Sequence, residues 1–115
     1  MENKKLDIIV QACEDKKATD IKVLEIGEFS SIADYFVIVS GNSSTQVDSI
    51  SDNIEDKMSE AGYEVENSEG KNSLRWIVLD YSDIIVHIFH KDERDFYNLE
   101  RLWEDREKQE DKEED

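Results

Sequence analysis

The residue types that perform covalent or metal chemistry are few in this chain. Its single cysteine, Cys13, lies on the apolar stripe of a helical pattern, where burial keeps a thiol protonated. His87 and His90 lie around the end of an apolar run, and the sequence has no second cysteine and no HxxxH pattern to complete a metal site. We therefore predict that Cys13 is a small core residue and that the chain has no catalytic residue, no metal site and no cofactor.

Acidic pairs are the next candidates, although 30 acidic residues make chance pairs common. Glu64 and Glu66 share one face of a weak strand pattern, and Asp80 and Asp83 flank a turn, so either pair could bind a divalent cation or do acid–base work. A solvated edge and turn capping by aspartate explain both pairs more simply. Residues 41–44, at a strand-to-helix junction, could seat a phosphate, but an ordinary helix cap explains them as well.

The densest unexplained cluster of the sequence combines aromatic and charged residues. Its members are Trp76, residues 79–83, His87, Arg94, Phe96, Tyr97 and Trp103. Protein interfaces concentrate aromatic rings and arginine, because a large ring buries much area with little loss of conformational entropy. Each ring taken singly is equally well explained as core, but the cluster as a whole predicts a protein-binding face.

The helices that must position these residues follow from apolar spacing. A first helix is predicted over residues 6–13. A second helix begins after Ser43, which has capping-box spacing to Gln46, and it ends at Gly62. A short C-terminal helix carries Phe96, Leu99 and Trp103.

The predicted strands complete the fold. They lie at residues 21–26, 34–40, 63–67, 74–79 and 84–89. We expect the first two to be buried, the third to be a sheet edge, and the last two to form an antiparallel hairpin around residues 80–83. The order predicts an α/β fold with a single five-stranded mixed sheet and helices packed on it. Both faces of the hairpin are apolar, so three helices leave part of one face for a partner protein or a second copy.

Composition restricts the class of protein further. The chain has 115 residues and a formal net charge of −16, which fits one domain over residues 1–103 and an acidic, disordered tail over 104–115. Its apolar runs are too short to cross a bilayer, and its one cysteine suits the reducing cytoplasm. The acidity disfavours naked nucleic acid and favours a basic protein surface.

Several ordered blocks resemble the ribosomal silencing factor family, also called Iojap-like. The blocks lie at residues 34–43, 46–47, 69–70, 76–81, 83–90 and 94–103. The resemblance implies a nucleotidyltransferase-like α/β fold without known catalysis, in a cytoplasmic factor that is likewise expected to form a homodimer. It also implies binding to ribosomal protein uL14 of the large subunit, which sterically blocks joining of the small subunit and represses translation when nutrients are limiting.

In this family the hairpin and the block after it form the ribosome-facing surface. On this chain the matching positions are Trp76, Leu79, Asp80, Tyr81, Asp83, His87, Arg94 and Tyr97. Two positions depart from the family pattern, since Ser82 and Lys91 stand where many relatives have glycine and proline.

Two other functions remain as alternatives. One is a small nucleotidyltransferase-type enzyme that uses residues 40–43 for phosphates, although Asp48 has no Asp-x-Asp partner for magnesium. The other is a generic acidic adaptor for some other basic protein.

Overall fold

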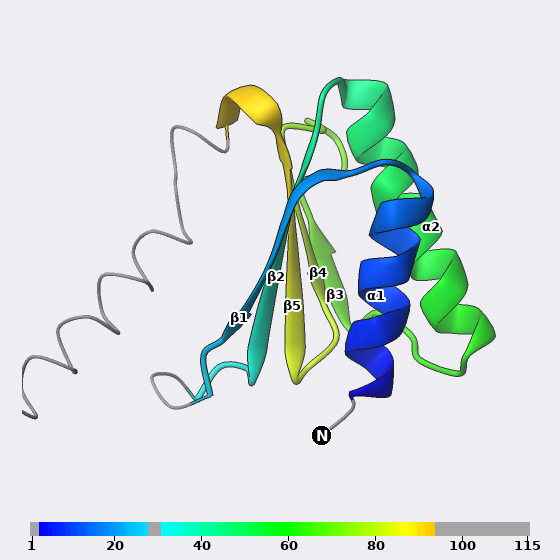
Figure 1. Cartoon of the computed structure of the whole chain (residues 1–115), viewed down its shortest axis with the longest axis vertical. Helices are drawn as coiled ribbons and strands as arrows, with labels where there is room; N and C mark the ends of the chain where they lie inside the picture. The colour runs from blue at the N-terminus through cyan, green and yellow to red at the C-terminus, as the bar shows by residue number, and fades with distance from the viewer. Residues whose placement is uncertain (1–2, 28–30, 94–115) are drawn as a thin grey trace, which may run out of the picture.

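The computed structural model describes residues 3–27 and 31–93. In chain order the elements are α1 (Lys4–Asp15), β1 (Thr19–Glu25), β2 (Tyr35–Gly41), α2 (Ser44–Glu60), β3 (Asn67–Glu69), β4 (Trp76–Asp80) and β5 (Ile84–His90). Both helices lie side by side on one face of a twisted sheet (Figure 1). The predicted C-terminal helix and the predicted tail 104–115 lie outside the described residues.

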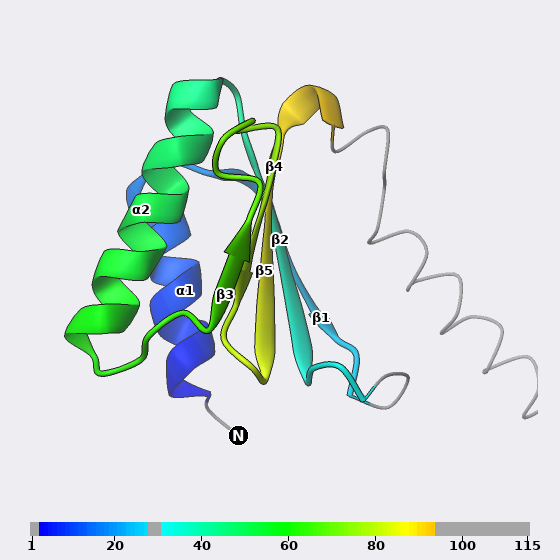
Figure 2. The same cartoon turned by 180° about the vertical axis from the view of Figure 1, so that it is seen from behind.

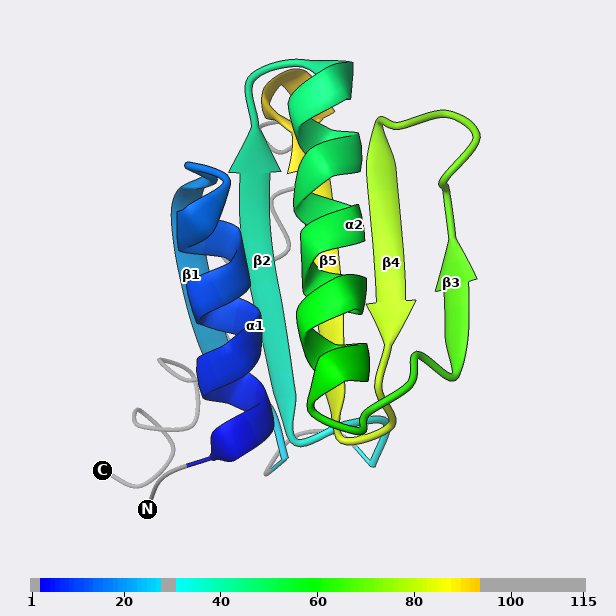
Figure 3. The same cartoon turned by 90° about the vertical axis from the view of Figure 1, so that its right-hand side faces the viewer.

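The sheet is five-stranded and mixed, as predicted. Its strand order is β1-β2-β5-β4-β3, and β5 is therefore the central strand (Figure 3). β2 and β5 run parallel, with Tyr35 opposite Ile84 and Gly41 opposite His90. The β4–β5 pair is an antiparallel hairpin, as expected, closed by a 2.9 Å hydrogen bond from Tyr81 N to Ile84 O.

Two strand predictions differ from the structure. The first strand was expected to be buried, but β1 is an exposed edge, and Val23 is 42% exposed. The third predicted strand, 63–67, is displaced: β3 covers Asn67–Glu69 at the opposite edge, because Tyr63 and Val65 pack against the core from a loop instead of joining the ladder. The edge position of this strand is confirmed.

Side-chain caps fix where the helices begin. Asn3 Oδ1 accepts from Leu6 N at 3.1 Å, and Ser43 Oγ accepts from Gln46 N at 3.1 Å. Gln46 departs from the simple capping box, because its Oε1 accepts from Asn42 N and its Nε2 donates to the main-chain carbonyls of residues 16 and 17. This one side chain therefore joins the start of α2 to the end of α1.

The hydrophobic core lies between the sheet and the helices. α1 contributes Ile9, Ala12 and Cys13, and α2 contributes Val47, Ile50, Ile54 and Met58. The central strands supply the facing layer with Val37, Val39, Val86 and Ile88. In the described parts of the chain, neither helix has the length and apolar character needed to cross a membrane.

Candidate protein-binding surface

Alternation along the strands of the hairpin sorts their side chains between two faces. Ile77 and Leu79 of β4, with Val86 and Ile88 of β5, belong to the core under the helices. The residues that alternate with these point to the opposite face, which we call the second face. It carries Trp76, Val78, Asp80, Ile85, His87 and Phe89 from the hairpin and Phe36 and Ile38 from β2. Figures 1 and 2 show the two described helices on the other side of the sheet.

The second face carries an aromatic cluster of Phe36, Trp76, His87 and Phe89. Trp76 lies opposite Phe89 across the β4–β5 ladder, and their rings stack with centroids 4.8 Å apart. Phe36 meets His87 edge-on at 4.7 Å. These spacings are typical of favourable aromatic pairs, so the cluster holds its rings in defined orientations.

His87 has a defined protonation state in this cluster. Trp76 Nε1 donates to His87 Nδ1 at 3.1 Å, and because indole N–H is only a donor, Nδ1 is the unprotonated nitrogen. Burial lowers the pKa of His87 to about 4, so the ring is neutral with its proton on Nε2. Nε2 is buried and has no hydrogen-bond partner among the described residues. Leaving such a donor unsatisfied costs about 1–3 kcal/mol.

The predicted contact residues divide between the two faces. Trp76, Asp80 and Asp83 are half-buried, whereas His87 is 7% exposed. Leu79 is 0% and Tyr81 3% exposed, and both belong to the core on the helix side, where a partner does not reach their side chains in this arrangement. Arg94 and Tyr97 lie outside the described residues.

The two aspartates of the hairpin turn have structural partners. Asp80 Oδ1 accepts from Ser82 N at 2.7 Å, which confirms the turn-capping interpretation for this residue. Asp83 Oδ1 pairs with Lys5 Nζ at 3.0 Å and joins the turn to α1. Ser82 adopts φ +76°, a left-handed conformation that favours the glycine expected from the family resemblance.

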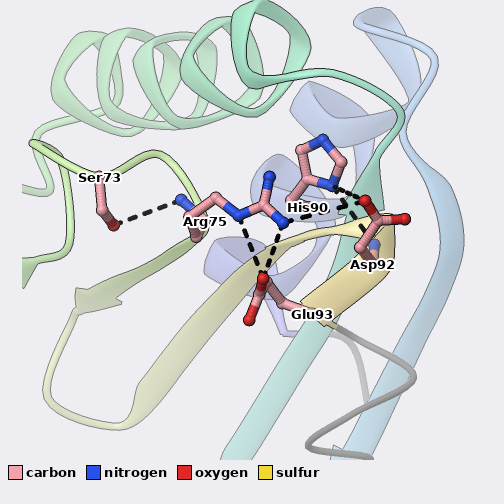
Figure 4. A network of polar contacts seen from close by, with 5 residues as sticks. All are labelled: Ser73, Arg75, His90, Asp92 and Glu93. Carbon is pink, nitrogen blue, oxygen red and sulfur yellow. Dashed lines mark hydrogen bonds and ion pairs between the residues drawn. The ribbon is translucent and has the colours of Figure 1, made fainter.

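A second polar group lies at the other end of the hairpin (Figure 4). Arg75 donates from Nε and Nη2 to Glu93 Oε1 at 3.1 and 2.8 Å, and Nη2 lies 3.9 Å from Asp92 Oδ2. His90 Nδ1 accepts from Asp92 N at 3.3 Å. The sequence reasoning missed this group, although hairpin register places the residue before β4 beside those after β5. This polar group joins Arg75, just before β4, to the helical residues 91–93.

The positions considered for catalysis have ordinary structural roles. Ser43 caps α2, and a Cβ at Gly41 would come within 2.9 Å of Val47 Cγ2, so this junction packs directly on the helix. Cys13 is fully buried, and burial, with a smaller contribution from Glu14, raises the pKa of its thiol to about 12. Within residues 3–27 and 31–93, no three His, Cys, Asp or Glu side chains are placed to hold a metal ion.

In the described residues, the fold is that of a small α/β protein with two helices on one face of its sheet and an aromatic cluster on the other. A family model described as "Ribosomal silencing factor during starvation" matches residues 1–115. The chain is 48% identical over 100 residues to the ribosomal silencing factor RsfS of Bacillus subtilis, covering 87% of this chain and 85% of that protein. It therefore belongs to the ribosomal silencing factor family.

Two further comparisons extend this result. A crystal structure of a protein from Chromobacterium violaceum superimposes with a TM-score of 0.86 at 32% identity, covering 90% of this chain and 87% of that one. A more distant relative, from Mus musculus, is named "Mitochondrial assembly of ribosomal large subunit protein 1" and is 26% identical over 101 residues, covering 85% of this chain and 44% of that protein.

Proposed function

We propose that this protein is a ribosome-associated regulator that binds the large ribosomal subunit and blocks joining of the small subunit. Its target there is ribosomal protein uL14, and the result is reduced translation under nutrient limitation. Family membership supports a silencing role at the ribosome, and the name of the murine relative connects the family with the large subunit. The protein acts without catalysis, in the cytoplasm, and forms a homodimer as the family resemblance implies.

The observation that supports this proposal best is the position of Trp76. This half-buried indole belongs to an ordered aromatic cluster on the face opposite the two described helices, at one end of the hairpin. A rigid, partly exposed aromatic ring is the kind of residue that dominates binding energy in interfaces. We propose that Trp76 contacts the large subunit, together with Arg94 and Tyr97.

The charge of the chain supports a basic partner. The formal net charge is −16, and ribosomal proteins are basic, so attraction raises the association rate while repulsion limits unspecific contact with rRNA. Asp80 and Asp83, at the turn of the hairpin, pair with lysine or arginine groups of the partner. Leu79 and Tyr81 take part indirectly, by supporting the hairpin from the core side.

Sucrose-gradient sedimentation with purified ribosomal subunits tests the proposal. We expect the wild-type protein to migrate with the large subunit alone and to reduce the amount of whole ribosome. Trp76→Ala weakens this association more than tenfold, and Asp80→Asn, which keeps an acceptor oxygen for the turn, weakens it about threefold. Asp56→Asn removes the same single charge at an exposed position of α2, so it is the matched control and changes the association much less than Asp80→Asn does.

Three results would contradict the proposal. Migration with the small subunit, or no association with either subunit, would exclude the silencing mechanism. Association that excess small subunit does not compete would indicate an adaptor that binds elsewhere. Calorimetry with nucleoside triphosphates and Mg²⁺ tests the enzymatic alternative. Detectable heat of nucleotide binding would support that alternative.

A further inference from the structure

We infer that His87 is a positioning residue, whose Nδ1 atom holds the Trp76 indole in the orientation that meets the large ribosomal subunit. This inference rests on the proposed function and deepens it. The family resemblance places His87 among the contact residues, whereas the structure assigns it to the support of a contact residue.

The first argument is geometric. An indole on a strand surface rotates about two side-chain torsions, and two contacts of Trp76 restrain these rotations. Its ring stacks on Phe89 with 25° between the planes, and its N–H donates to His87 Nδ1 at 3.1 Å. The stack sets the plane of the ring, and the hydrogen bond sets the direction in which its N–H edge points.

The second argument is that His87 is itself held in place. Its ring lies between Phe36, which meets it edge-on at 4.7 Å, and Trp76, whose centroid is 6.0 Å away. The main chain of His87 belongs to the central strand and pairs with Ile38 on one side and Val78 on the other. A hydrogen-bond acceptor on this strand is therefore a fixed reference point for the indole.

The third argument is that stability alone does not explain an imidazole at this position. The ring is 7% exposed, and its Nε2–H is buried with no partner in the described part of the chain. An apolar ring of similar size would fill the space without an unsatisfied donor. The imidazole accepts a hydrogen bond from Trp76. An apolar ring could not accept this bond, so the bond is a functional reason for a histidine at this position.

Burial also separates His87 from direct contact. Nε2 is inaccessible, and Nδ1 is already occupied by the indole N–H. A partner that approaches the second face therefore reaches Trp76, which is half-buried, before it reaches the imidazole. His87 acts through the ring that it orients.

Two substitutions of the full-length protein test this role. His87→Phe keeps an aromatic ring and removes the acceptor, while His87→Asn places an amide oxygen near the position of Nδ1. Three quantities are measured: the dissociation constant for purified large subunits, the urea midpoint of unfolding, and the indole N–H signals in ¹H–¹⁵N spectra. Because the chain has two tryptophans, the Trp76 signal is assigned with Trp103→Phe.

We expect His87→Phe to be at least as stable as the wild type, to shift the Trp76 indole signal toward that of an unbonded N–H, and to bind large subunits about tenfold more weakly. His87→Asn restores the signal and brings the affinity within about threefold of the wild type. A purely structural role would instead lower the urea midpoint and leave the affinity of the folded protein unchanged.

The possible failures are distinguishable. If the wild type binds large subunits and His87→Phe binds equally well with a displaced indole signal, the inference is wrong and the proposed function stands. An unchanged indole signal in His87→Phe also overturns the inference, because the orientation then does not depend on His87. If the wild type itself does not bind, the proposed function fails and the positioning role fails with it.

Discussion

Gly70 packs against the main chain of Trp76 so closely that a Cβ atom at Gly70 would lie 1.9 Å from the Trp76 carbonyl oxygen. Gly70 also has φ +85°, which side chains rarely adopt. We expect Gly70→Ala to lower the free energy of unfolding by more than about 2 kcal/mol, since it adds a backbone clash to the conformational strain. Urea unfolding measures this loss.

Gly62 is the matched control for this substitution. It has φ +91°, but no atom lies within 4 Å of a Cβ added there. Gly62→Ala should therefore cost only the conformational strain, about 1 kcal/mol. Equal losses for the two variants would show that the loop before β4 moves away from Trp76 without penalty.

Acid should weaken the fold through His87. Burial lowers the pKa of His87 to about 4 in the folded state, from an ordinary value of 6.5 in the unfolded chain. Between these values the unfolded state binds an extra proton and the folded state does not. His87 therefore has no pH-dependent effect on the free energy of unfolding above pH 6.5, and it lowers that free energy progressively as the pH falls toward 4. From about pH 7.5 to about pH 5, we expect the wild type to lose roughly 2 kcal/mol relative to His87→Phe.

Parallel pH profiles of the two proteins would contradict this expectation. The comparison is made as a difference because the 30 carboxylates of the chain also titrate in acid. Their contribution is common to both proteins and cancels.

Cys13 should react with thiol reagents only when the protein unfolds. It is 0% exposed, and burial with a smaller contribution from Glu14 raises the pKa of its thiol to about 12, so thiolate is scarce near neutral pH. We expect modification by a thiol-specific reagent to be at least about 100-fold slower in native buffer than in urea. The double variant Cys13→Ser/Val23→Cys, with its thiol at an exposed position of β1, is the fast-reacting control. Fast native modification of Cys13 would show that α1 detaches readily.

Lys5 should compete with the ribosome for Asp83. The pair joins Lys5 Nζ and Asp83 Oδ1 at 3.0 Å, with side chains 28% and 38% exposed, so solvent screening limits its contribution to stability to at most about 1 kcal/mol. Lys5→Met frees the carboxylate, and we expect it to bind large subunits about twofold to threefold more tightly. Asp83→Asn loses a similar amount of stability but binds more weakly. If both variants shift the affinity in the same direction, Asp83 has no role in the contact.

Local sequence signals were sufficient for both described helices. Ser43 and Gly62 correctly marked the ends of α2, because caps and positive-φ stops depend on neighbouring residues. The exposure of β1 could not be predicted in the same way. Its apolar residues suit a buried strand, but pairing of β5 with the far side of β2 leaves β1 at the edge, and this depends on residues some sixty positions away.

The candidate surface could likewise be predicted only in part, because some of its features depend on local sequence and others on long-range pairing. Alternation separates Trp76 and Asp80 from Leu79 and Tyr81 without further information. Alternation does not tell which of the two pairs faces the helices, because that depends on the path of the chain across the sheet. The resemblance placed all four on one surface, whereas the structure puts Leu79 and Tyr81 in the core.

The central position of β5 determines when the sheet can be assembled as the chain is synthesised. Without Ile84–His90 the sheet divides into two unconnected pairs, β1 with β2 and β3 with β4. A nascent or prematurely terminated chain that lacks this strand therefore has no continuous platform for Trp76. Because His87 and Phe89 themselves belong to β5, the aromatic cluster is complete only after this last strand of the sheet has been synthesised and inserted.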